Sequence, residues 1–205
     1  MRKCLPNFLI IIGVIAVVSA FALSLYNFWD NGRASRVAGE ILEAVSSRIP
    51  NSEDGFRPNG EEFIPDYVLN PNMNMPAIEY EGYEYIGVLS IPIIDIDLPV
   101  MDSWSYAQLA IAPCRYSGSA YLNDMVIAAH NYTGHFGRLK NLEKGDSVIF
   151  TDADGNVFNY TVSKIETLLP AAVEEMTNGD WDLTVFTCTV GGRTRIAIRC
   201  TLDKS

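Results

Sequence analysis

The sequence LTVFTCTVGGRTRIAIR, residues 183–199, contains two strand-forming segments separated by a Gly-Gly pair. The first segment is β-branched and aromatic and ends at Cys188. In the second segment Arg195, Ala197 and Arg199 alternate with isoleucines, and this period of two is typical of a half-buried strand. We therefore expect a β-hairpin that carries Cys188 and Arg195 at facing ends of its two strands.

A thiol beside a guanidinium is a candidate nucleophilic site. A cysteine nucleophile needs a cation or base near its thiolate and a hydrogen-bond donor for the oxyanion that forms at the attacked carbonyl. Arg195 meets the first and last of these needs, and the base would be one of the two histidines, His130 or His135. The simpler alternative is that Cys188 is a small buried hydrophobe at a strand end.

Both histidines lie in the segment VIAAHNYTGHFGRL, residues 126–139. His130 ends an apolar strand, which is a rigid platform for a catalytic side chain, whereas His135 follows in a glycine-containing loop and is expected to be more exposed. Two histidines without a neighbouring cluster of cysteines or carboxylates make a weak zinc site. We therefore predict no metal ligands and no cofactor.

Short strand patterns fill the chain from residue 83 onward. They predict strands at 85–91, 93–100, 119–123, 125–130, 146–151, 157–163 and 165–169. Residues 106–112 predict a short helix or turn, 136–142 a short helical turn or loop, and 171–177 a short helix. Many short strands with few helices indicate an all-β barrel or sandwich. The segment 152–155 begins like a calcium loop, but Ser163 stands where the twelfth-position Glu belongs, so we predict an Asp-Gly hairpin turn instead.

The N-terminal segment is long and apolar enough to cross a membrane. Residues 4–29 carry no charge and follow Arg2 and Lys3, and about 20 apolar residues span a bilayer as a helix. The preceding positive charges predict a cytoplasmic N-terminus and an exported remainder. A signal peptide cleaved after the small-x-small residues 20–22 is the alternative. We favour an uncleaved anchor because the apolar run continues to Leu25.

Between the anchor and the strands, residues 34–49 have a helical apolar stripe and predict a stalk or a helix packed on the domain. Residues 51–76 are rich in Asn, Pro, Gly and acidic residues and predict a spacer, with a lid over the site as the alternative. The predicted organisation is therefore an anchor at 1–29, a stalk and linker at 30–82 and a β-domain at 83–205.

The net charge and the cysteines limit which partners the chain can bind and which cysteine pairs it can form. The net charge is −10 and there is no run of Lys or Arg, so we expect no nucleic-acid partner. Cys114, Cys188 and Cys200 would all be exported, and a Cys114–Cys200 disulfide that leaves Cys188 free is one possible arrangement.

The segment TVFTC, residues 184–188, resembles the TLxTC signature of sortases, the membrane-bound cysteine transpeptidases of Gram-positive bacteria, with Val185 in place of Leu. The strand that ends at His130 and the FGRL segment after it resemble the family's histidine strand, and the separation of His130 from Cys188 is similar. Arg195 matches the family's arginine on the last strand. Arg193 and Arg199 are rival positions, and Arg195 is preferred because it opens the apolar strand across the turn.

The resemblance implies a closed eight-stranded β-barrel with short helices, preceded by an N-terminal transmembrane helix. It implies cleavage of an LPxTG-like sorting signal of secreted proteins through a thioacyl intermediate, and transfer to an amine of the cell-wall peptide precursor. It assigns Cys188 as nucleophile, His130 as acid and base, Arg195 as donor and Thr187 as a substrate-binding residue. Residues 165–182 would read the sorting signal, and the catalytic domain would be extracellular on a single-pass membrane anchor.

The subclass is predicted from two further features. Pilin-polymerising members carry an Asp-Pro-aromatic lid and a C-terminal membrane helix, and this sequence has no Asp-Pro pair and no apolar tail before Ser205. We therefore expect a non-pilin member that is class B- or D-like. Three alternatives remain open: a pilin-polymerising sortase, a hydrolase that uses the same site, and a non-catalytic, membrane-tethered β-domain that binds a surface partner.

Overall fold

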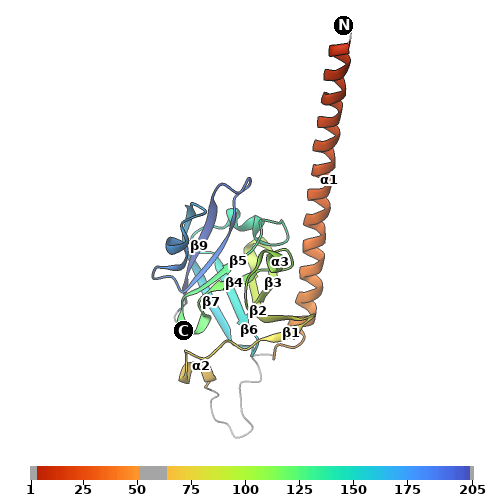
Figure 1. The fold of residues 1–205 in the computed structure, drawn as a ribbon. Coiled ribbons are helices and arrows are strands. Elements are labelled where there is room, and N and C mark those ends of the chain that lie inside the picture. The colour runs from red at the N-terminus through yellow and green to blue at the C-terminus, as the bar shows by residue number, and fades with distance from the viewer. Residues whose placement is uncertain (1–3, 51–63, 204–205) are drawn as a thin grey trace. The chain divides into compact units, whose positions relative to one another are not determined.

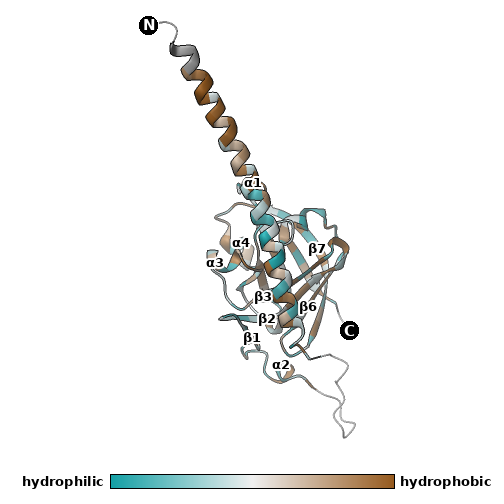
Figure 2. Ribbon diagram, turned by 90° about the vertical axis from the view of Figure 1, so that its right-hand side faces the viewer, coloured by the Kyte–Doolittle hydropathy of each residue, from teal (hydrophilic) through white to brown (hydrophobic). Residues whose placement is uncertain are grey.

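The computed structural model describes residues 4–50 and 64–203, and only the backbone of residues 4–7. The chain forms two compact units, Met1–Arg33 and Ala34–Ser205. The first helix, α1, covers Cys4–Ser46. Its apolar N-terminal part has exposed side chains from Phe8 to Trp29, coloured brown in Figure 2. By its length and by an 18-residue window of mean hydropathy 2.8, α1 is a candidate membrane span, which agrees with the predicted anchor.

The strands of the second unit form one sheet that closes on itself. The strands are β1 (Ile78–Tyr80), β2 (Tyr83–Ile91), β3 (Ile96–Met101), β4 (Cys114–Ser117), β5 (Met125–Ala128), β6 (Ser147–Asp152), β7 (Val157–Leu168), β8 (Leu183–Cys188) and β9 (Arg195–Leu202). Their order is β1-β2-β3-β4-β5-β8-β9-β7-β6, and β2 also pairs with β6. That last pairing closes a ring of eight strands, β2 to β9, which confirms the predicted barrel (Figure 1).

Short helices connect the strands. They are α2 (Asp66–Leu69), η2 (Pro92–Ile94), α3 (Tyr106–Leu109), η3 (Ala120–Leu122), η4 (Phe136–Asn141) and α4 (Val173–Thr177). The helical segments predicted around 106–112, 136–142 and 171–177 are therefore confirmed as α3, η4 and α4, with shorter bounds.

A glycine makes the closure of the barrel possible. Gly87 of β2 pairs with Asp152 of β6 and has a φ of 152°. A Cβ atom at this position would lie 2.0 Å from the backbone oxygen of Thr151. The ladder between β2 and β3 also shifts register between Tyr85 and Gly87, which bends β2 where it must serve two partners.

Two apolar clusters lie on the two faces of the barrel wall. The interior is filled by alternate residues of the strands, among them Leu89, Ile127, Phe150, Val185 and Ile198, which are fully buried. Outside the wall, Ile41 and Val45 of α1 pack with Tyr85, Met101 and Cys114. The helix predicted at 34–49 is thus the C-terminal part of α1, and it packs on the domain through residues spaced three and four apart.

Four local predictions differ from the structure. The strand predicted at 93–100 begins only at Ile96, because residues 92–94 form η2 and Asp95 adopts a left-handed conformation. Residues 119–123 form η3, because the Ser119 hydroxyl caps the backbone N–H of Tyr121 and Asn123 adopts a left-handed conformation. Strand β4 was missed because its four residues, CRYS, show no apolar alternation. The strands predicted at 157–163 and 165–169 are one strand, β7, which continues through an irregularity between Val162 and Lys164.

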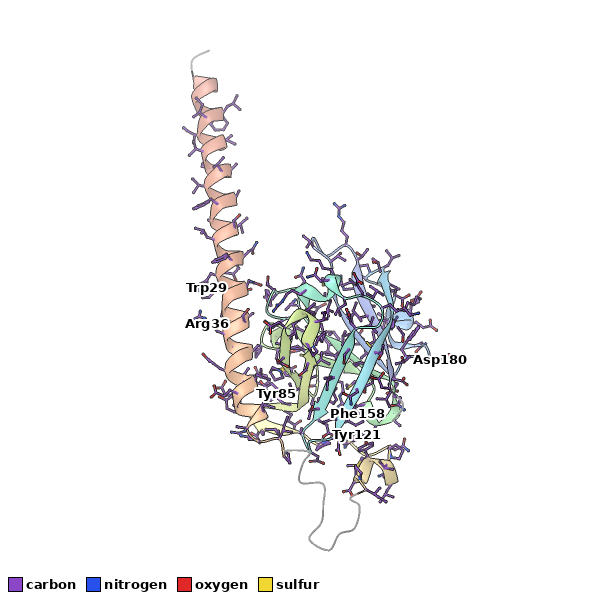
Figure 3. The ribbon with its side chains drawn as sticks, turned by 180° about the vertical axis from the view of Figure 1, so that it is seen from behind. Trp29, Arg36, Tyr85, Tyr121, Phe158 and Asp180 are labelled. Atoms are coloured by element: carbon purple, nitrogen blue, oxygen red, sulfur yellow. The ribbon has the colours of Figure 1, made fainter. Side chains whose placement is uncertain are left out.

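The turn between β6 and β7 is held by Asp152, which is fully buried. Its carboxylate accepts hydrogen bonds from the backbone N–H groups of Asp154 and Asn156, the Asn156 amide and the Tyr121 hydroxyl. The carboxylate thus serves the hairpin turn that the sequence predicted. Near this turn Tyr67 of α2 stacks on Tyr121 at 4.6 Å between ring centroids. Figure 3 shows Tyr121 beside Phe158, whose rings are 6.0 Å apart.

The location of α2 shows that one part of the predicted linker is not a lid over the site. Tyr67 and Tyr121 line a cavity with Leu202 and Asp203, at the end of β9 opposite to Arg195. The α2 part of the predicted linker therefore lies far along the barrel from Cys188 and is not a lid over it. Residues 51–63 of that linker lie outside the described residues.

Candidate active site

Strand register brings Cys188, His130 and Arg195 to the same end of the barrel. Strand β8 lies between β5, its parallel neighbour, and β9, its antiparallel neighbour. Ala128 pairs with Phe186, so His130 and Cys188 each follow two residues beyond the last pair of that ladder. On the other side Cys188 pairs directly with Arg195. Three neighbouring strand ends thus carry the three predicted residues.

Alternation along β8 sets the direction of the Cys188 side chain. Leu183 and Val185 belong to the interior core, whereas Phe186 packs with the outer clusters. Cys188 shares the parity of Phe186 and therefore lies on the outer face of the wall. It is partly exposed rather than buried, so the simple reading of Cys188 as a core residue is wrong.

A cavity of about 180 Å³ opens beside Cys188. Its residues include all four predicted site residues, His130, Thr187, Cys188 and Arg195. The remaining wall is aromatic and aliphatic, formed by Trp104, Tyr106, Leu109, Tyr116, Ala128, Ala129, Leu169, Pro170, Ala172, Val173, Met176 and Phe186. Such a surface suits an extended peptide with apolar side chains.

The aromatic residues of this wall contact one another in series. The rings of Trp104 and Tyr116 are 5.1 Å apart, and Tyr116 meets Phe186 edge-on at 5.4 Å. Phe186 lies on the same face of β8 as Cys188, so the aromatic series leads along the cavity to the thiol.

A second, smaller cavity of about 120 Å³ also includes Cys188. It is lined by Asn131, Phe136, Gly137, Lys140, Thr187, Cys188, Thr189, Val190 and Ile196. Thr187 and Cys188 line both cavities.

The backbone just before His130 is fixed to β8 by two hydrogen bonds. The Thr187 hydroxyl donates to the carbonyl of Ala129 at 2.8 Å, and the Ala129 N–H donates to the carbonyl of Phe186 at 3.2 Å. Thr187 is 3% exposed. Its predicted contact with substrate stays a prediction, but its hydroxyl already has a partner that holds the histidine segment.

The three arginines of the hairpin have different surroundings. Arg195 lines the larger cavity and donates from Nη1 to the carbonyls of Gly192 and Thr194, both at 3.1 Å. Arg193 is exposed in the turn, and Arg199 is buried. The sequence predicted a half-buried strand with the arginines on one face; Arg199 of that face is nevertheless buried, because α4 covers that part of it.

His135, which was expected to be exposed, is 0% exposed. The loop folds back on itself, since the N–H groups of His135 and Gly137 both donate to the carbonyl of Tyr132. It also lies against α1: a Cβ atom on Gly134 would fall 2.1 Å from the Ser35 hydroxyl oxygen. His135 is therefore part of the packing under the loop, and His130, which is partly exposed, is the histidine of the cavity.

The suggested Cys114–Cys200 disulfide is wrong. Both residues are free thiols, and they lie on opposite faces of the barrel wall, Cys114 in the outer cluster and Cys200 in the interior. Burial raises the pKa of each thiol to about 12. Cys114 and Cys200 are buried, whereas Cys188 is partly exposed and lines the cavity described above.

The family model for the sortase domain matches residues 89–203, which is more than half of the chain. The chain belongs to the sortase family. Membership implies a cysteine transpeptidase. The matched region begins within β2 and includes every residue predicted for the site. No curated protein sequence matches this chain.

Solved sortase structures share the fold at low sequence identity. The sortase D5 transpeptidase of Clostridium perfringens has a TM-score of 0.59 and 18% identity, and the match covers 82% of this chain and 99% of that one. Sortase A of Corynebacterium diphtheriae has a TM-score of 0.54 and 20% identity over 93% of this chain and 96% of that one. Sortase C1 of Streptococcus suis has a TM-score of 0.52 and 24% identity over 60% and 75%. Sortases of three classes thus resemble this barrel to a similar degree.

Proposed function

We propose that this sortase cleaves an LPxTG-like sorting signal of secreted proteins and joins the new carboxyl end to an amine of the cell-wall precursor. The observation that carries the proposal is the position of Cys188, with His130 and Arg195 on the two neighbouring strand ends and an apolar cavity beside all three. The cavity offers a peptide a path to the thiol, and the two basic side chains offer proton transfer and oxyanion stabilisation.

In the proposed first step the Cys188 thiolate attacks the carbonyl carbon of the threonine in the signal. The C–S bond forms, the peptide C–N bond breaks, and His130 protonates the leaving amine. Arg195 donates to the oxyanion or to the substrate backbone, which requires its guanidinium to leave the carbonyls of Gly192 and Thr194. The product is a thioacyl enzyme on Cys188.

In the second step an amine attacks the thioacyl carbon, and His130 accepts its proton. The C–S bond breaks and a new amide bond forms. The second cavity also includes Cys188 and would leave room for the amine while the acyl chain fills the first cavity; the product that is released separates transfer to an amine from hydrolysis.

The same proposal includes the cellular setting. The N-terminus would be cytoplasmic, with the anchor at 1–29, the stalk and linker at 30–82 and the extracellular catalytic domain at 83–205. The absence of an Asp-Pro pair in the sequence supports a non-pilin, class B- or D-like member.

Intact-mass spectrometry of the compact unit 34–205 tests the function. The protein is incubated with a library of LPxTG-like peptides, with and without an added amine. We expect a thioacyl adduct on Cys188 that the amine releases as an amide; release only as a free acid would instead indicate a hydrolase. Cys188→Ala should form no adduct, whereas the matched control Cys200→Ala should keep it. A wild-type Cys188 that forms no adduct and resists thiol reagents would rule out the enzyme.

A further inference from the structure

Arg199 is a charged side chain buried in the barrel wall without a role in the chemistry above. It lies on β9 and is 1% exposed. It shares a face of the strand with Arg195 and Ala197, so it points away from the barrel interior. A buried charge is costly unless it is paired and its donors are satisfied. The position of Arg199 therefore calls for an account of its partners.

The Arg199 guanidinium joins three segments of the chain. Its Nε donates to Glu166 Oε1 on β7 at 2.8 Å, and its Nη1 donates to Thr184 Oγ1 on β8 at 3.0 Å. Nη1 also donates to the carbonyl of Met176 at 2.8 Å, and Nη2 donates to the carbonyl of Glu175. The planar guanidinium can serve these partners together because its donors are held in a fixed fork.

The two carbonyls belong to the last turn of α4, where helix carbonyls lack partners within the helix. Between residues 169 and 180, the hydrogen bonds that the described chain shows to other elements are these two from Arg199. Apolar packing supplies the rest of the attachment, through Met176 against Val126 and Ala197. Arg199 thus provides the hydrogen bonds that attach α4 to the barrel.

Helix α4 forms one wall of the cavity beside Cys188, through Val173, Met176 and the preceding Ala172. We propose that Arg199 is a positioning residue that holds α4 at the separation from Cys188 that the peptide substrate requires. The proposal rests on the proposed function for its substrate. It also gives Thr184, the first threonine of the TVFTC segment, a role as an acceptor for Arg199.

Removal of the Arg199 guanidinium should affect α4 locally and leave the rest of the fold intact. Without the guanidinium, the contacts of Met176 still hold α4 near the barrel, so the strands should stay folded while α4 becomes more mobile. A mobile wall should weaken peptide binding, which appears in KM, more than the reaction of the thiol itself. A small thiol reagent needs no cavity wall, so its rate with Cys188 should not change.

The experiment uses the full chain in detergent micelles and compares Arg199→Met, Arg199→Lys and the control Arg48→Met. Arg48 donates to the carbonyl of Glu79 at 2.8 Å, so the control also removes an arginine–carbonyl hydrogen bond, but away from α4. We expect amide exchange in residues 173–178 to rise about tenfold or more in Arg199→Met, because hydrogen bonds from charged donors are lost. The peptide KM should rise by a similar factor, alkylation of Cys188 by iodoacetamide should keep its rate, and Arg199→Lys should lie between.

Unchanged exchange in α4 together with an unchanged KM would overturn the proposal. The proposal would also be overturned if the alkylation rate of Cys188 fell by the same factor by which the peptide KM rose. If Arg199→Met does not fold, Thr184→Val removes one acceptor at constant volume and should raise exchange in the same residues; unchanged exchange there would count equally against the proposal. A wild-type chain that forms no acyl adduct would refute the proposed function alone, since the exchange measurement still decides whether Arg199 holds α4.

Discussion

Cys188 and Arg195 are direct cross-strand partners at the open end of the β8–β9 ladder, the last residue of one strand opposite the first of the next. The pairing places the two residues opposite one another by strand register, while the Arg195 guanidinium bonds to the carbonyls of Gly192 and Thr194. The turn that joins them has Gly191 and Gly192 at φ values of 84° and 70°, a conformation that glycine adopts without strain.

Replacing Arg195 should reduce catalysis with little effect on stability. The side chain of Arg195 donates to carbonyls of its own turn, those of Gly192 and Thr194. Arg195→Ala should therefore leave the melting temperature nearly unchanged. Loss of an oxyanion donor typically lowers kcat by about 10²–10³. Peptide acylation kinetics and thermal unfolding measure the two effects. Arg193→Ala, which removes an exposed arginine of the same turn, should keep full activity; equal losses in both variants would contradict the assignment.

Substitution of His130 should lower activity and leave stability unchanged, whereas substitution of His135 should lower stability. His130→Gln should lower the acylation rate by about 10²–10⁴, as for loss of a general acid and base, with a normal melting temperature. His135→Ala should destabilise the fold by about 2 kcal/mol, because a buried side chain is removed. Denaturant unfolding and single-turnover acylation separate them. A His135 variant that is stable but inactive would reverse the two assignments.

Substitutions of Thr187 distinguish a positioning role from substrate binding. Thr187→Val leaves the buried carbonyl of Ala129 without its hydroxyl donor, which should cost about 1–3 kcal/mol and shift the pH profile of acylation as His130 moves. Thr187→Ser should retain both properties. A rise in KM alone, with unchanged stability and pH profile, would instead favour the direct contact with substrate that the sequence resemblance implies.

The barrel seam should not tolerate a side chain at Gly87. In Gly87→Ala the new Cβ would collide with the Thr151 backbone, so we expect destabilisation by more than about 3 kcal/mol or failure to fold. Gly39→Ala is the matched control, since it lies in α1 with nothing within 4 Å. Because alanine favours helices, that variant should be more stable by up to about 1 kcal/mol. Equal melting temperatures for the two variants would argue against a tight seam.

Stability should contain an acid-dependent contribution from Glu166. Burial would raise the pKa of this carboxyl, but hydrogen bonds from Lys164 and Arg199 outweigh burial and lower it from the ordinary value of 4.5. The stabilisation is therefore fully present above pH 4.5 and is lost as the pH falls through the lower pKa of the folded state. Glu166→Gln should lack this component in the unfolding free energy measured against pH.

The comparison with Glu166→Gln is needed because other carboxyl groups titrate in the same range. Burial and the charges of Asp152 and Asp66 raise the pKa of Asp154, so its contribution changes with pH in the opposite direction. The difference between wild type and variant isolates Glu166. A difference that does not vary with pH would show that its carboxylate adds nothing to stability.

Local sequence patterns were sufficient to predict several features of this protein. The alternation in residues 195–199 and the β-branched run before Cys188 predicted the closing hairpin, because strand formation and side-chain parity depend on neighbours along the chain. The uncharged run of residues 4–29 predicted the candidate membrane helix for the same reason. The TVFTC segment with His130 and Arg195 indicated the family.

Tertiary structure decided what depends on residues far apart in sequence. The β2–β6 seam, the burial of His135 and the separation of Cys114 from Cys200 all follow from which faces meet when the sheet closes. The partners of Thr187 and Arg199 lie on other strands and on α4, and no local spacing encodes them. The sequence by itself determined most of the strands and the reactive residue types, whereas barrel closure, through non-local register and packing, decided which of those residues share one cavity.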